Sequence, residues 1–152
     1  MPRLIKRILI GIAVTVGVLA VMQLIPYGRD HSNPAVVKEP AWDRPETRAL
    51  AVRACFDCHS NETRWPWYAN VAPFSWVMQR HVDIGRTVLN FSDWTRTYDL
   101  AAQAPSNVLM GEMPIRSYLW FHPESDLTVA EKDALASGLE ATFGLPTRQS
   151  RR

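Results

Sequence analysis

The sequence predicts an all-α protein, in which one N-terminal transmembrane helix is followed by a small helical domain. Three observations lead to this fold class. Residues 8–25 form a long apolar run. Several later segments repeat apolar residues with the period of a helix, and none shows the strict alternation expected of a half-buried strand. A chain of 152 residues has room for one ordinary domain and one further element.

The apolar run reads ILIGIAVTVGVLAVMQLI and contains only Thr15 and Gln23 as polar residues. A helix over this run would be roughly 27 Å long, which is close to the hydrocarbon thickness of a bilayer. The following MQLIPYGRD lacks the small residues of a cleavage site. An uncleaved signal anchor is therefore favoured over a cleaved signal peptide and over a buried core helix.

The charges that flank the run predict its orientation. Arg3, Lys6 and Arg7 precede it, whereas Arg29 on the other side is offset by Asp30. The positive-inside rule places the N-terminus in the cytoplasm and the soluble domain on the periplasmic side of a bacterial inner membrane. Without the three N-terminal basic residues, 14 of the 17 lysines and arginines remain, against 15 aspartates and glutamates. The part of the chain that contains the domain is therefore mildly acidic. This balance argues against nucleic acid as a partner.

Composition divides the chain into four segments. The signal anchor covers residues 1–27, and a polar, proline-containing linker covers residues 28–44. The helical domain covers residues 45–145, and a basic tail follows at residues 146–152. The four segments are expected to act as anchor, spacer, folded domain and solvated end.

Helical periodicity predicts four helices in the domain, at about residues 45–59, 74–89, 93–104 and 129–143. Ser92 would cap the third of these helices, and Pro105 would end it. The last helix has the clearest signals, because Thr128 and Glu131 form a capping box and Gly144 follows the apolar stripe.

The pentapeptide CFDCH contains both cysteines of the chain, Cys55 and Cys58, followed directly by His59. A disulfide between them would close a very short loop and stabilise little. A thiol redox pair needs the N-terminus of a helix after a strand, whereas this motif falls at the end of a predicted helix. Structural zinc needs four ligands, and none of His31, His81 and His122 stands in a paired spacing that could complete them.

Covalent haem attachment accounts for all three residues of the motif. Cysteines at positions i and i+3 can reach the two vinyl groups of one porphyrin, and the next histidine then binds iron through Nε2 as the proximal ligand. We therefore predict one haem c attached to Cys55 and Cys58, with His59 as proximal ligand. Aromatic residues near the motif could line the porphyrin: Trp65, Trp67, Tyr68, Trp76, Trp94 and Trp120.

Several side chains compete for the sixth position on the iron. Met113 is favoured, because its Met-Pro loop resembles the distal-ligand loop of small c-type cytochromes and a thioether ligand favours Fe(II). His81, in the apolar stripe of the second helix, is the alternative distal ligand, and an open site comes next. Met110 and His122, which is expected to be exposed, are weaker candidates. Arg86 could pair with a haem propionate, although a solvated helix arginine is the simpler interpretation.

With these residues assembled, the chain resembles the bacterial haem-binding domain family over residues 42–143. The segments CFDCHSNETRWPWYANVAPFSWVMQRHVDIGRTVLNFSDW and GEMPIRSYLWFHP carry the resemblance. It implies a small, cytochrome c-like helical domain with one haem c held by Cys55, Cys58 and His59. It says little about physiology, since such families are defined by their cofactor.

The sequence therefore predicts a membrane-anchored, mono-haem electron carrier that exchanges single electrons with a redox partner protein. An enzyme is less favoured; as a haem peroxidase or small-ligand enzyme it would need an open distal site, with His81 and Arg86 as acid/base pair. A haem-based sensor is a further alternative. A thiol module would instead be colourless and carry a titratable Cys55–Cys58 pair.

Overall fold

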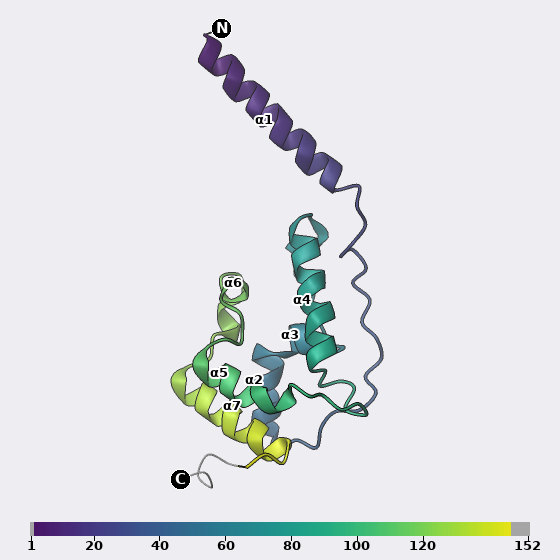
Figure 1. Cartoon of the computed structure of the whole chain (residues 1–152), viewed down its shortest axis with the longest axis vertical. Coiled ribbons are helices and arrows are strands. Elements are labelled where there is room, and N and C mark those ends of the chain that lie inside the picture. The colour runs from purple at the N-terminus through teal and green to yellow at the C-terminus, as the bar shows by residue number, and fades with distance from the viewer. Residues whose placement is uncertain (1, 147–152) are drawn as a thin grey trace. The chain divides into compact units, whose positions relative to one another are not determined.

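The structure is a computed structural model that describes residues 2–146 (Figure 1). Every regular element within these residues is helical, with one isolated bridge between Lys38 and Asp93. The predicted all-α class is thus confirmed. The predicted basic tail lies outside the described residues, apart from Pro146.

Seven α-helices and three short 3₁₀ helices follow one another within residues 2–146. In chain order they are α1 (Arg3–Met22), α2 (Pro45–Ala54), α3 (Phe56–His59), η1 (Trp67–Asn70), α4 (Phe74–Val88), η2 (Ala101–Gln103), α5 (Ala104–Met110), α6 (Arg116–Leu119), η3 (Pro123–Ser125) and α7 (Val129–Thr142).

Helix α1 is the predicted apolar helix. It has 20 residues, an 18-residue stretch of it has a mean hydropathy of 2.2, and none of its residues is buried. By length and composition it is able to cross a membrane. The remaining helices are too short or too polar for this, within the described residues.

The chain forms two compact units. The first contains the residues up to Ser32 together with Trp65–His81, and the second contains Asn33–Arg64 together with the chain from Val82 onward. Helix α4 contributes its first part to the first unit and its last part to the second.

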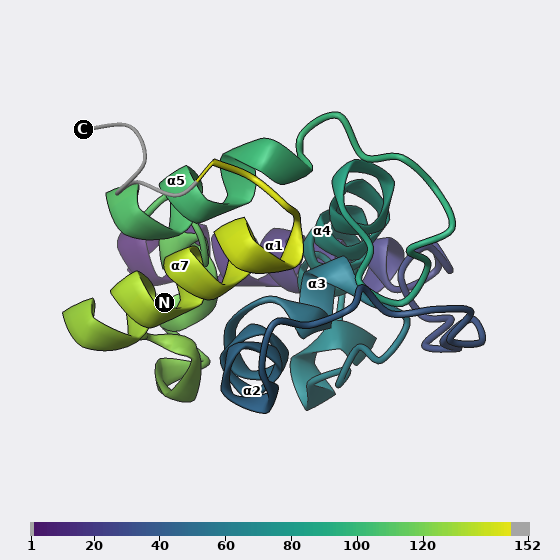
Figure 2. The ribbon, with the colours of Figure 1, turned by 90° about the horizontal axis from the view of Figure 1, so that it is seen from below.

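The second unit is built around α7, against which both α2 and α5 pack (Figure 2). Phe91 lies at the centre of its core and is 1% exposed. The ring of Phe91 stacks with those of Phe56, Trp94 and Phe143 at centroid distances of 5.5, 6.4 and 6.4 Å. Large aromatic side chains bury much area per residue, which suits a unit made of short helices.

Two of the predicted helices differ from the structure. The first is interrupted at Cys55, whose φ of −125° separates α2 from α3, so the cysteine motif does not lie on one continuous helix. The helix predicted over residues 93–104 is wrong: residues 93–100 form no helix, and Pro105 lies in the first turn of α5 instead of ending a helix. Proline fits the first turn because the N–H that it lacks has no partner there anyway.

The other two predicted helices are confirmed. The second corresponds to α4. The last corresponds to α7, where the hydroxyl of Thr128 accepts from the N–H of Glu131 and the Glu131 carboxylate accepts from the N–H of Thr128. Arg53 also donates to Glu131. The Arg53 guanidinium, with the two groups of Thr128, lowers the pKa of Glu131 from 4.5 to about 2.

The capping box predicts a pH-dependent difference between wild type and Glu131→Gln. The folded-state pKa lies below the ordinary value, so the carboxylate contributes stability above pH 4.5 that is lost as the pH falls towards 2. Glutamine preserves the capping box but not the charge. We expect the deficit in unfolding free energy of the variant to be largest above pH 4.5 and to shrink on acidification, as measured by chemical unfolding between pH 2 and 6. A constant deficit would contradict this.

Candidate haem site

The CFDCH motif lies at the junction between α2 and α3, in the second unit. The N–H of Cys55 donates to Ala51 O at 2.8 Å and so completes α2, and the N–H of His59 donates to Cys55 O at 2.9 Å and so forms α3. Cys55 and Cys58 are free thiols and are half-buried. The junction therefore holds both cysteines and His59 within two short helical turns.

A cavity of about 290 Å³ opens beside this junction. Three predicted site residues line it together: Cys55, His59 and Met113. The rest of its wall is mainly apolar; much of it comes from α4 and α5, for example Val88 and Val108. Its volume lies at the lower end of small-molecule sites, which span about 300–1,000 Å³. Cys58 is not among the described residues that line it.

The ring of His59 is held in the tautomer that leaves Nε2 available to a metal. Its Nδ1 lies 3.0 Å from both Gly85 O and Leu89 O. Carbonyl oxygens only accept hydrogen bonds, so Nδ1 carries the proton and the lone pair is on Nε2. Burial lowers the pKa of His59 and keeps the ring neutral. Both features match the pattern of a metal-binding histidine whose other nitrogen donates to backbone.

The same helix contact requires glycine at position 85. A Cβ on Gly85 would lie 2.2 Å from Cys58 O, much closer than van der Waals contact allows. Glycine thus permits α4 to approach α3 closely enough for its carbonyl to accept from His59. The arrangement of motif and helix fits a proximal histidine, and the apolar lining with a thioether has the chemistry that suits contact with a porphyrin.

Arg86 holds the chain that follows the motif. Its Nε donates to Ser60 O at 2.8 Å, and its NH2 group donates to Asn33 Oδ1 at 2.8 Å and to Thr63 Oγ1 at 3.0 Å. Burial is the main cause of its lowered pKa. The prediction of a solvated arginine was therefore wrong, because three oxygens of the second unit bind this guanidinium.

A buried carboxylate lies inside the motif itself. Asp57 is 5% exposed, and its carboxylate accepts from Arg64 Nε and NH2, both at 3.1 Å. Tyr118 donates to Asp57 Oδ2 at 2.5 Å from a position 61 residues away in the sequence. Burial, followed by this hydrogen bond, raises the pKa of Tyr118. The bond joins the CFDCH motif to α6, which lies shortly after Met113 in the chain.

Removing the hydrogen bond from Tyr118 to Asp57 should measurably destabilise the second unit. Tyr118→Phe removes one hydrogen bond to a buried charged acceptor, and such bonds contribute about 1.5–3 kcal/mol. Tyr98→Phe is a matched control, since Tyr98 is 9% exposed and donates to the neutral Asp93 O at 3.0 Å. The control should lose only about 0.5–1.5 kcal/mol. Urea unfolding of both variants in detergent checks this, and equal losses would contradict it.

The structure also bears on the alternative chemistries of the cysteines. Burial is the main cause that raises the pKa of each thiol, Cys55 and Cys58, to about 12. A redox-active thiol needs the opposite shift. Among the described residues, no three histidine, cysteine or acidic side chains gather as zinc would require. Both observations argue against these alternatives.

The other candidate ligands lie in different surroundings. His81 is half-buried on the part of α4 that belongs to the first unit, so it remains the alternative prediction. Met110 is 64% exposed. The side chain of His122 is only 12% exposed and stacks on Tyr118 at 4.0 Å, so the expectation that it is exposed was wrong.

The expected aromatic lining of the porphyrin is not found in the second unit. Trp94 packs in the core against Phe143 at 5.0 Å, and Trp120 is 78% exposed. Phe91 is the one aromatic residue that lines the cavity in the described part of the chain. The lining is mostly aliphatic instead.

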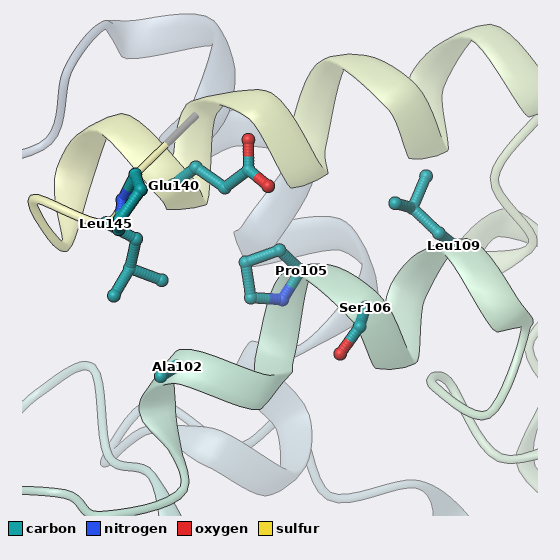
Figure 3. A pocket seen from close by; sticks show the side chains of 7 residues that line it. Ala102, Pro105, Ser106, Leu109, Glu140 and Leu145 are labelled. Carbon is teal, nitrogen blue, oxygen red and sulfur yellow. The ribbon is translucent and has the colours of Figure 1, made fainter. Parts of the chain in front are cut away.

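A second cavity of about 380 Å³ lies between α5 and the end of α7 (Figure 3). The buried Glu140 and the ring of Pro105 line it, together with small and aliphatic residues. Histidine, cysteine and methionine are absent from its described lining, so it offers no axial ligand for an iron.

Comparison with known proteins also indicates a haem-binding protein. A family model described as a haem-binding domain matches residues 17–141, which is most of the chain. Neither the search of curated proteins nor the search of solved structures gave a match. The match, together with the His59 tautomer and the apolar cavity, shows that this chain belongs to the haem-binding domain family.

Proposed function

We propose that this protein is a membrane-anchored, mono-haem cytochrome of the c type that carries single electrons. One observation carries the proposal: Cys55, His59 and Met113 line the same apolar cavity. These are an attachment residue, a proximal ligand and a distal ligand, drawn from α3, its junction with α2 and a loop more than 50 residues later. Cys58, one helical turn from Cys55, is the second attachment residue.

Attachment would use the two thiols without any external oxidant. Each S–H would add across one vinyl group, so that sulfur bonds to the carbon next to the ring and hydrogen goes to the terminal carbon. Cys55 and Cys58 are both free for this addition. Two thioethers would fix the haem beside His59.

Bound haem would supply a one-electron Fe(III)/Fe(II) couple. The residues of the chain hold and tune it. His59 presents Nε2 because Gly85 O and Leu89 O fix its other nitrogen. Met113 offers a thioether, which favours Fe(II) and raises the reduction potential. The apolar lining excludes water and so limits the reorganisation that accompanies a change of charge.

The N-terminal helix would keep this carrier at the periplasmic face of a bacterial inner membrane. The basic residues before α1 support that orientation. A tether of this kind raises the local concentration of the haem domain near a membrane-bound redox partner protein. The mildly acidic domain supports a protein partner and not a nucleic acid.

Electron transfer is favoured over peroxidase chemistry by the contacts of Arg86. A peroxidase needs a polar group free to act on a ligand at the distal site. Arg86, the predicted partner of His81 in that role, donates to Ser60 O, Asn33 Oδ1 and Thr63 Oγ1 instead. A carrier needs no such group.

The test is to express the full chain in a bacterium that contains the cytochrome c maturation system and to purify it from membranes. A haem-stained band on a denaturing gel, a mass increase of one haem and a single one-electron potentiometric wave are expected. A colourless protein would reject haem attachment. A covalent haem that binds added peroxide or carbon monoxide at once would favour the enzyme or sensor instead.

A further inference from the structure

The first unit exposes large apolar side chains around the end of α1. Trp67 is 80% exposed, Phe74 49% and Val71 44%. The rings of Trp67 and Tyr68 lie 5.9 Å apart and those of Tyr68 and Phe74 lie 6.2 Å apart, so these aromatic residues form a continuous chain. We refer to Trp67, Val71 and Phe74 as the apolar rim.

Two hydrogen bonds join Ala72, beside the rim, to Gln23 at the end of α1. Gln23 Nε2 donates to Ala72 O at 2.9 Å, and the N–H of Ala72 donates to Gln23 Oε1 at 3.0 Å. Ala72 lies between Val71 and Phe74 in the chain, and it is buried. Figure 1 shows the turn that precedes α4 beside the segment that leaves α1. The rim is therefore held at the level of Gln23.

Close backbone packing reinforces this connection. A Cβ on Gly28 would lie 2.3 Å from Ser75 O, and Gly28 adopts a φ of +76°, so glycine is required there twice over. His31 Nε2 lies 3.2 Å from Ala69 O, and its ring stacks on Trp65 at 4.6 Å. Three separate contacts thus fix the segment after α1 to the chain around the rim.

The length of α1 determines where Gln23 and the apolar rim would lie relative to a bilayer. Twenty residues at 1.5 Å per residue span about 30 Å, which matches the hydrocarbon core of a bilayer. If α1 spans the membrane, its last turn and Gln23 reach the boundary between hydrocarbon and headgroups. We propose that the apolar rim lies in the headgroup layer, so that the bilayer surface is the partner of this face. This inference rests on the membrane anchoring in the proposed function.

The chemistry of the rim suits lipid. Tryptophan and phenylalanine gather at membrane interfaces, where an apolar ring can enter the acyl boundary. Arg29 and Arg80 of the same unit are exposed and can pair with lipid phosphates. The rim would act as a second membrane contact, and it would limit rotation of the first unit about the long axis of α1.

The test uses the full, haem-loaded chain in nanodiscs of phosphatidylcholine that carries a photoactivatable group near the top of one acyl chain. After illumination, trypsin releases three informative peptides: residues 8–29 from α1, residues 65–80 with the rim, and residues 117–132 with Trp120. Trp120 is 78% exposed and serves as a control matched to Trp67. Mass spectrometry quantifies the lipid adducts on each peptide.

We expect several-fold more adducts on residues 65–80 than on residues 117–132, and a several-fold drop in the former when Trp67 and Phe74 are both changed to serine. Serine at Trp120 should change nothing. Adducts on residues 8–29 with only the control level on residues 65–80 would overturn the proposal and leave a protein as the occupant of the rim. If residues 8–29 also lack adducts, membrane anchoring itself is rejected.

Discussion

Alanine at both Cys55 and Cys58 is expected to remove all covalently held haem, so that haem staining of a denaturing gel falls to background. The chain contains no other cysteine, and a thioether needs a thiol. The apolar cavity and His59 remain in this variant, so the protein could still bind haem without a covalent bond. Extraction with acidified solvent separates the two cases, because only haem without a thioether leaves the protein.

Single substitutions of the cysteines test the two predicted thioethers one at a time. Cys55→Ala and Cys58→Ala should each retain one thioether, and the spectrum of the reduced pyridine complex reports how many vinyl groups remain on the porphyrin. The single variants should therefore match each other and fall between wild type and the double variant. Circular dichroism of the double variant serves as a control for folding, since the helical signal reports whether α2, α5 and α7 still form although Cys55 packs against their core. Haem that survives denaturation in the double variant would contradict the assignment.

The features that could be predicted from the sequence are those determined over short distances in the chain. The capping box of α7 needs only Thr128 and Glu131, three residues apart, and the structure contains it. The helix α1 follows from one apolar run. The CFDCH motif likewise encodes its cysteine and histidine spacing within five residues, and the structure brings Cys55 and His59 to one cavity.

The features that could not be predicted depend on contacts between distant segments. Nothing near Asp57 indicates that Tyr118, 61 residues later, donates to it. Arg86 looks like a surface residue of a helix until the chain around Ser60 folds against it. Gly85 is the residue from which one such contact could have been inferred. Glycine is unfavourable inside a helix, so its presence inside α4 indicates that another segment approaches closely there.

The ligand assignment leads to the second large effect. Met113→Ala is expected to abolish the weak far-red charge-transfer band of a methionine-ligated ferric haem. It should also lower the reduction potential by on the order of 0.1–0.3 V, within the about 0.8 V that axial ligands control. The physical reason is that a thioether stabilises Fe(II) relative to Fe(III), whereas water or a nitrogen ligand does not. Absorption spectra and potentiometric titration of the full chain measure both quantities.

Met110→Ala is the matched control, because Met110 lies three residues earlier and is 64% exposed, whereas Met113 lines the cavity. The control should keep the band and the potential of wild type. If Met113→Ala also leaves both unchanged while His81→Ala changes the spectrum, the haem has two histidine ligands and the methionine assignment is wrong. If neither variant changes the spectrum, no protein side chain occupies the sixth position of the iron. An enzyme that binds a small molecule at that position then becomes more plausible than an electron carrier.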